Sequence, residues 1–252
     1  MTVSGSDVVS NPTSGQLVAD SIRRNIILGE FRDGDFLPNE TQLLAQYGVS
    51  RPVLREAIRI LQSESLLTIR RGSKGGARIN APQPDPVARQ AAGLLQYNQT
   101  TVFDVFRARS IIEPPAARLL AESRTPATIQ RIREALDNES NSLGDPRKWG
   151  RAHAQFHILV VELSGSNTLA LFAHIMGDIT GAHTSAVLHH ASNEDQIRVD
   201  ADLAHRVHRK LARLVEEGKG AEADELWRAH LEETTDKMLE TQGSRKLLDL
   251  YS

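Results

Sequence analysis

Residues 39–78 read NETQLLAQYGVSRPVLREAIRILQSESLLTIRRGSKGGAR, and this stretch decides the fold of the N-terminal part of the chain. Asn39 and Gln42 have the spacing of a helix capping box. Gly48 follows a short apolar repeat and is typical of a helix C-terminus. Ser50 then predicts the cap of a second helix. Two short helices joined by a tight glycine turn are typical of the helix-turn-helix, whose second helix enters the major groove of DNA.

The second predicted helix has two distinct faces. Pro52 suits its first turn, where a fixed φ and a missing N–H cost least. Apolar residues recur at helical spacing on one face, namely Leu54, Ala57, Ile58 and Leu61. Three arginines at steps of four line a different face, namely Arg51, Arg55 and Arg59. A lone charge stripe is more often a solvated helix face, but its place after a capping box and a glycine turn favours DNA binding.

A β-hairpin is predicted directly after this helix. Residues 66–70 are strand-like, residues 71–76 form a turn, and residues 77–79 return as the second strand. The tip has no bulky side chain and several positive ones, which suits contact with phosphates or the minor groove. A plain flexible turn is the simpler interpretation of its glycines. A phosphate-binding nucleotide loop is disfavoured, because no glycine loop ending in Gly-Lys-Ser/Thr leads from a strand into a helix.

The segment from about Leu17 to Ile79 resembles the winged helix-turn-helix of the GntR family of bacterial transcription regulators. The residues that carry this resemblance are Leu37-Pro38-Asn39-Glu40, Tyr47-Gly48-Val49-Ser50-Arg51, Leu54-Arg55-Glu56-Ala57 and Arg71-Gly72. The rest of the chain resembles the all-helical effector domain, called FCD, of the FadR-like branch. The resemblance implies that Arg51 and Arg55 contact base edges and nearby phosphates, and that Arg71 and Gly72 contact DNA from the wing. Ser50 and Lys74 complete the expected set.

Composition is consistent with two compact domains. The chain has 252 residues, 40% of them hydrophobic, and no cysteine, so thiolate ligands are excluded and a reducing bacterial cytoplasm is expected. The net charge is −2, yet residues 14–80 hold ten Lys and Arg against seven Asp and Glu, a surplus of three. The positive groups therefore gather in the predicted DNA-binding part, as expected of a protein associated with the nucleoid. No apolar stretch is long enough to span a membrane.

Four segments are expected along the chain. Residues 1–13 are a disordered lead rather than a signal peptide, and residues 14–80 form the winged helix-turn-helix. Residues 81–90 are a proline-rich linker, whose first six residues are expected to continue neither strand nor helix. Residues 91–245 form an all-helical effector-binding and dimerisation domain, an antiparallel bundle. Its helices are expected at about 86–97, 101–123, 127–141, 146–165, 168–189, 194–217 and 221–241.

All nine histidines fall inside this bundle. His153 and His157 are four residues apart, so both imidazoles project from one helical face. His208 and His230 each belong to an apolar stripe on a later helix. A hydrogen-bonded core histidine explains any one of them, but four converging imidazoles favour a divalent transition metal. Zinc is the expected ion, with nickel and manganese as alternatives.

The resemblance sharpens the ligand set and reveals a departure. Metal-binding FadR-like domains place an Asp or Asn and a His one turn apart on one helix, with two further histidines on later helices. His157, His208 and His230 match the three histidines, while His153 stands at the carboxylate position and removes one negative charge. His205, one turn before His208, is a candidate substitute ligand or supporting group.

Arg109 is the candidate effector-binding residue. In the family an arginine at this position faces the ligand cavity, where it holds a carboxylate bidentately. An intrahelical ion pair with Glu113, four residues later, explains the same arginine almost as well.

These features predict a dimeric, ligand-responsive transcription regulator with a winged helix-turn-helix and a helical bundle. We expect a repressor that a small carboxylate effector releases from a palindromic operator. A direct metal sensor is an alternative. A metal-dependent hydrolase is disfavoured, and no enzymatic activity is expected, because helical His-x-x-x-His chemistry needs a glutamate beside the first histidine, where Ala154 stands.

Overall fold

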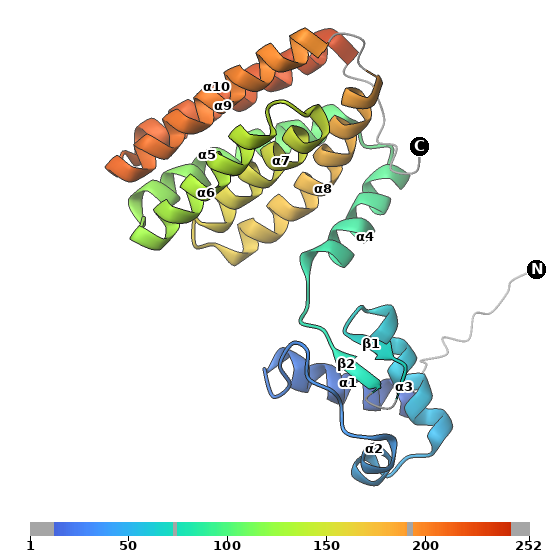
Figure 1. The fold of residues 1–252 in the computed structure, drawn as a ribbon. Coiled ribbons are helices and arrows are strands. Elements are labelled where there is room, and N and C mark those ends of the chain that lie inside the picture. Colours follow the sequence, from blue (N-terminus) through green and yellow to red (C-terminus); the bar gives the residue numbers. More distant parts are fainter. Residues whose placement is uncertain (1–12, 73–74, 191–193, 243–252) are drawn as a thin grey trace, which may run out of the picture. The chain divides into compact units, whose positions relative to one another are not determined.

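The computed structural model describes the backbone of residues 13–72, 75–190 and 194–242, and it does not describe the side chains of 182–195, 197 and 238–242. The chain is mainly helical and divides into two compact units, Met1–Pro86 and Val87–Ser252 (Figure 1). The predicted disordered lead falls almost wholly outside the described residues, and so does Lys74.

The N-terminal unit is a winged helix-turn-helix, as predicted. Its elements are α1 (Ser14–Ile27), α2 (Glu40–Tyr47), α3 (Arg51–Ser63), β1 (Leu67–Arg70) and β2 (Gly76–Ile79). Helix α1 packs against α3 and buries Ile22 completely. One apolar core joins the helices and the hairpin of this unit, and it includes Leu43, Leu54, Leu61 and Ile79. The apolar face of α3 is therefore fixed by close packing in this core.

The turn between α2 and α3 has the predicted chemistry. The Gln42 N–H donates to Asn39 Oδ1 over 3.0 Å, and the Asn39 N–H donates to Gln42 Oε1 over 3.0 Å, which completes the capping box. Gly48 adopts φ +62°, a left-handed conformation that favours glycine. The prediction for Ser50 is wrong in one respect. Ser50 occupies the cap position of α3, but its hydroxyl makes no capping hydrogen bond, and Pro52 in the first turn of that helix has no N–H to offer.

The wing is an antiparallel pair of strands, as predicted. Leu67 pairs with Ile79 and Arg70 with Gly76, so each strand is shifted by one residue from its expected start. Gly72, in the turn, has φ +116° and therefore needs the freedom of glycine. An additional β-bridge joins Phe36 to Arg78, a contact that no sequence pattern indicated.

The described part of the C-terminal unit contains the seven predicted helices, the first of which begins three residues before the unit. They are α4 (Pro84–Tyr97), α5 (Val102–Glu122), α6 (Pro126–Ser142), α7 (Pro146–Glu162), α8 (Asn167–His190), α9 (Glu194–Glu217) and α10 (Gly220–Gln242). The prediction that residues up to Pro86 continue no helix is wrong, because α4 begins at Pro84. Both prolines lie in its first turn, where no N–H is required.

The core of the bundle lies among α5, α6, α7, α9 and α10. Phe156, Leu211 and Trp227 are each completely buried there. The apolar stripes predicted for these helices therefore point inward, and they carry polar side chains of the same helices into the interior. No helix in the described part of the chain is long and apolar enough to cross a membrane.

Candidate DNA-binding face and candidate metal centre

The arginines of α3 lie on its exposed face. Arg51 is two-thirds exposed and lies 3.6 Å from the exposed carboxylate of Glu40, a distance too long for a hydrogen bond. Arg55 and Arg59 form no ion pair with a described residue. By contrast, Arg23 on α1 is held by Glu64 over 2.6 Å and by Asp20. The α3 guanidinium groups are therefore available for phosphates and base edges.

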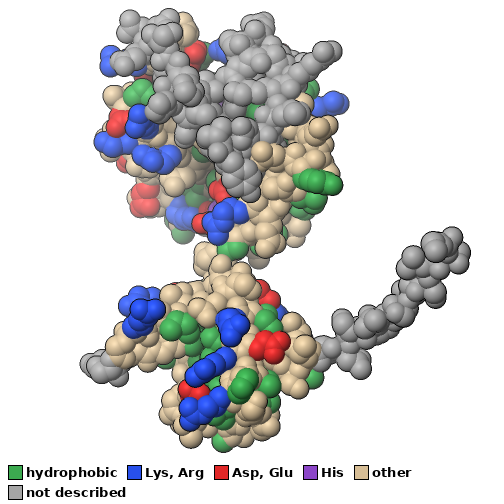
Figure 2. All heavy atoms as spheres, turned by 90° about the vertical axis from the view of Figure 1, so that its right-hand side faces the viewer, with side chains coloured by type: hydrophobic (Ala, Val, Ile, Leu, Met, Phe, Trp, Pro, Cys, Tyr) green, Lys and Arg blue, Asp and Glu red, His purple; other side chains and the backbone are tan. Residues whose placement is uncertain are grey.

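The wing adds exposed groups to this unit. Arg71 and Gly72 are exposed at its tip, whereas Arg78 is half-buried beside the Gly34 carbonyl. Figure 2 shows Lys and Arg side chains over one face of the N-terminal unit, where acidic side chains are few. The structure thus leaves Ser50, Arg51, Arg55, Arg71 and Gly72 exposed to solvent.

The four predicted metal ligands come together in the C-terminal unit. His153 and His157 lie on α7, His208 on α9 and His230 on α10. His153, His157 and His208 each offer one ring nitrogen within 4.8 Å of the others. The ring of His230 is centred 5.3 Å from that of His208 and 5.5 Å from that of His157. The four histidines that the sequence predicts to face inward therefore lie close together in the folded chain.

Each of the four imidazoles has a buried nitrogen that makes no hydrogen bond with a described residue, namely Nδ1 of His153 and Nε2 of the other three. The Nε2 atoms of His157, His208 and His230 are fully buried, and none has a hydrogen bond with a described residue. Buried polar atoms are normally paired, and leaving one unpaired costs about 1–3 kcal/mol. One divalent ion would satisfy all three nitrogens together, so the donor set fits a zinc-type ion.

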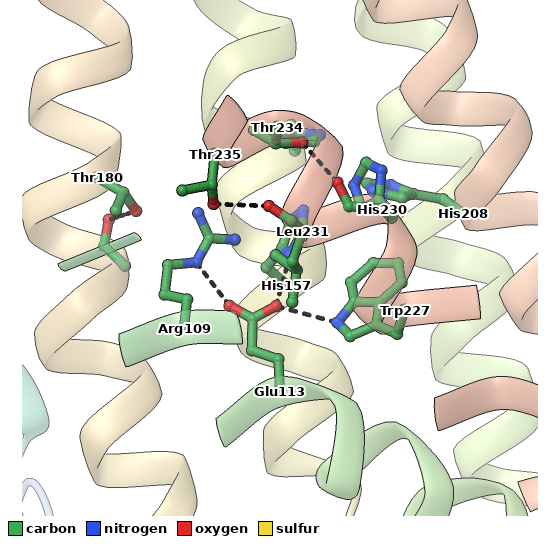
Figure 3. Close-up of polar contacts among 12 residues, drawn as sticks. Arg109, Glu113, His157, Thr180, His208, Trp227, His230, Leu231, Thr234 and Thr235 are labelled. Carbon is green, nitrogen blue, oxygen red and sulfur yellow. Dashed lines mark hydrogen bonds and ion pairs between the residues drawn. The ribbon is translucent and has the colours of Figure 1, made fainter. Parts of the chain in front are cut away.

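Glu113 on α5 orients one of the imidazoles, and the sequence did not reveal this role. Its Oε2 lies 2.7 Å from His157 Nδ1 and accepts a 3.0 Å hydrogen bond from Trp227 Nε1 (Figure 3). Since a carboxylate only accepts, His157 donates through Nδ1, which leaves its Nε2 lone pair for a metal. Oε1 of Glu113 accepts from Arg109 Nε over 2.6 Å.

Glu139 on α6 plays the same part beside His208, and the sequence did not single it out. It is completely buried. Nδ1 of His208 lies 3.0 Å from its Oε2, and Nδ1 of His205 lies 2.9 Å from the same atom. Oε1 lies 3.4 Å from Nδ1 of His153. His205 therefore contacts the supporting carboxylate rather than joining the other rings.

The electrostatics favour the protonation states that a metal site needs. Burial, the largest cause, lowers the pKa of His208 to about 4 and lowers the pKa values of His157 and His230 well below their usual range. Burial alone would raise the pKa of the Glu139 carboxyl, but the imidazoles of His153 and His208 hold that pKa well below its usual range. Near neutral pH the imidazoles of His157, His208 and His230 are therefore neutral and able to ligate a metal ion.

Arg109 lies beside this centre. Its side chain is 7% exposed, and its ion pair with Glu113 confirms the intrahelical interpretation. That pair uses Nε alone, and within the described residues neither Nη nitrogen has a hydrogen bond. Figure 3 shows the guanidinium on the same side of the cluster as the hydroxyls of Thr180 and Thr235. The two Nη nitrogens are therefore free to bind a carboxylate.

Two family comparisons agree with the fold. Residues 15–76 match the family described as bacterial regulatory proteins, gntR family, and residues 104–233 match the FCD domain. The second match alone covers more than half of the chain. The chain belongs to the GntR family of bacterial transcription regulators, in the FadR-like branch that joins a winged helix-turn-helix to an FCD domain.

Individual relatives match the chain at low sequence identity and over only part of its length. The chain is 28% identical over 163 residues to the HTH-type transcriptional repressor NanR of Cronobacter sakazakii, which covers 64% of this chain and 62% of that protein. NanR of Citrobacter rodentium is 29% identical over 154 residues, 60% of this chain and 58% of that protein. The match thus spans about three fifths of these relatives. The fold is similar to Streptococcus agalactiae GntR, with a TM-score of 0.66 and 22% identity, covering 88% of this chain and 99% of that one.

Proposed function

We propose that the protein is a ligand-responsive DNA-binding repressor that acts in the bacterial cytoplasm. The observation that carries this proposal is the exposed arginine face of α3, rigidly supported from below by Leu54 and Leu61. Arg51 and Arg55 would read base edges in the major groove. Ser50, whose hydroxyl makes no capping hydrogen bond, would donate that hydroxyl to a phosphate. Arg71 and Gly72 would meet the DNA backbone from the wing, and Lys74 would add a further positive charge. Duplex binding by wild type and by arginine variants tests this proposal.

The bundle would hold one divalent ion, with zinc the first choice and nickel or manganese as alternatives. His157, His208 and His230 would ligate through Nε2, and His153 would be the fourth ligand. Bound there, the ion supplies a positive Lewis-acidic centre that attracts a carboxylate. The protein's own contribution is to keep these imidazoles neutral, buried and fixed by Glu113 and Glu139.

The effector would be a small carboxylate held by Arg109 next to that centre. Glu113 bridges the two parts, because one of its oxygens binds Arg109 and the other binds the ligand histidine His157. An effector that binds the guanidinium of Arg109 therefore changes the ion pair with Glu113, and Glu113 also orients His157. Binding can shift the protein between two states only if the effector prefers one of them.

We expect replacement of Arg109 by Gln to weaken carboxylate binding by about 10–100-fold, because the positive charge and a charge-assisted hydrogen bond are lost while the amide can still donate. Thermal shift of the zinc-loaded protein with acetate, succinate, pyruvate and gluconate measures this. Arg118→Gln is the matched control, since Arg118 on the same helix also pairs with a glutamate four residues on but is exposed. A carboxylate that stabilises the Arg109 variant as strongly as wild type would exclude this role.

The repressor would act as a homodimer, in which a two-fold axis relates two recognition helices on a palindromic operator. Exposed apolar side chains on α5 support a contact with a second copy. Ile111 is 65% exposed and Leu119 is 42% exposed, and they lie eight residues apart on one face of the helix. Leu171 and Phe172 on α8 are exposed as well. Burying such side chains against a second copy is favourable.

A direct metal sensor is the alternative, and the family matches and the NanR relatives do not favour it. The two functions differ in what releases the operator. A sensor changes its DNA affinity when zinc alone is added or removed, whereas the proposed repressor keeps its ion and responds to a carboxylate.

A further inference from the structure

The charges around the histidine cluster do not balance without Glu139. This inference rests on the proposed metal site. Four neutral imidazoles around a divalent ion would leave two positive charges in a buried site, which is costly. Within the described residues two buried carboxylates contact these rings, Glu113 and Glu139. Glu113 is already paired with the buried guanidinium of Arg109 over 2.6 Å.

Glu139 has no such partner. It is completely buried, and no Lys or Arg of the described residues forms an ion pair with it. Its neighbours are three imidazoles, those of His153, His205 and His208. A buried carboxylate without a cation is as unfavourable as a buried cation without an anion. The positive charge of an ion among the histidines and the negative charge of Glu139 would lie next to each other, so each would offset the other.

The hydrogen bonds of Glu139 also direct the lone pairs of its neighbours. His208 donates from Nδ1 to Glu139, so its buried and unpartnered Nε2 is the nitrogen left for the ion. The same carboxylate reaches Nδ1 of His153 at 3.4 Å. One side chain on α6 therefore contacts two of the four candidate ligands, which lie on α7 and α9.

We propose that Glu139 is the charge-compensating and positioning carboxylate of this metal centre. Glu139 lies on α6 and contacts the ligand histidines from outside the group that they form. It supplies the negative charge that the imidazole of His153 does not. It sets the affinity for a divalent ion without ligating it.

Zinc titration against a chromophoric chelator tests this with the full-length protein. We expect Glu139→Gln, which preserves shape, to weaken zinc binding by about 10–100-fold, the usual cost of losing an orienting partner. Glu162→Gln is the matched control, because Glu162 on α7 makes a similar 2.9 Å contact with His174, a ring outside the cluster. Its zinc affinity should equal that of wild type. A Glu139→Gln/His153→Asp double variant returns an acid to the site and should regain about tenfold or more in affinity.

Thermal unfolding separates this role from a merely structural one. Without zinc, the unfolding temperature of Glu139→Gln relative to wild type measures the hydrogen bonds from His205 and His208 that the carboxylate accepts, and it is the baseline for the zinc-loaded comparison. With zinc, Glu139→Gln should gain less stability than wild type does. Equal zinc affinity of Glu139→Gln and wild type would overturn the inference alone, and so would an equal loss in Glu162→Gln. If wild type binds no zinc, the metal centre itself is wrong, and the inference fails with it.

Discussion

Alanine at Arg51 or at Arg55 weakens binding to the specific duplex by about 1–3 kcal/mol, roughly 5–150-fold, if each side chain reads a base edge. Both guanidinium groups are exposed on the first turns of α3, and neither is held by a close ion pair in the described structure. Truncation therefore removes a contact with DNA and, within the described residues, breaks only the exposed 3.6 Å ion pair of Arg51 with Glu40. Fluorescence anisotropy at fixed salt measures the loss.

Arg59→Ala is the matched control, because Arg59 lies on the same face but one turn further from the start of α3. It should lose less affinity than either of the other two variants. Unchanged binding by both Arg51→Ala and Arg55→Ala would show that α3 is not the recognition helix.

Removing a metal ligand has the second large effect. His208→Ala should weaken zinc binding by at least about 100-fold, since losing only an orienting partner already costs about 10–100-fold. The ring of His208 is completely buried, and its centre lies within 5.3 Å of the ring centres of His153, His157 and His230, so it is central to the cluster. Elemental analysis of protein purified without an affinity tag measures the metal content.

His174→Ala is the control for this substitution, because His174 contacts Glu162 and lies outside the cluster. Zinc removal should lower the unfolding temperature of the C-terminal unit and leave that of the N-terminal unit unchanged, since each unit has its own core. Zinc-free protein with the full stability of the zinc-loaded form would make these residues ordinary core histidines.

Local patterns predicted most of the fold. The capping box at Asn39, the glycine at position 48 and the helices of the bundle follow from spacing within one or two turns, and the structure confirms them. Predictions were wrong where two local signals compete, as at Pro84, where the proline begins a helix. The bridge between Phe36 and Arg78 joins residues 42 positions apart, so no local pattern could indicate it.

The supporting carboxylates were harder to predict than the histidines. The histidines stand out by type and by four-residue spacing, whereas Glu113 meets His157 across 44 residues and Glu139 meets His208 across 69. Only the packed bundle brings these pairs together. One signal was available. Glu139 follows Ile132 by two helical turns, so a charged residue stands on the buried face of α6.

Selection from a randomised duplex library tests the central claim, sequence-specific DNA binding through α3, most directly. The wild-type protein should enrich an inverted repeat whose half-sites are about one helical turn apart, as two symmetry-related recognition helices require. The Arg51→Ala/Arg55→Ala variant should enrich no repeat at the same salt concentration. Enrichment of the same repeat by this variant, or of none by wild type, would contradict the account.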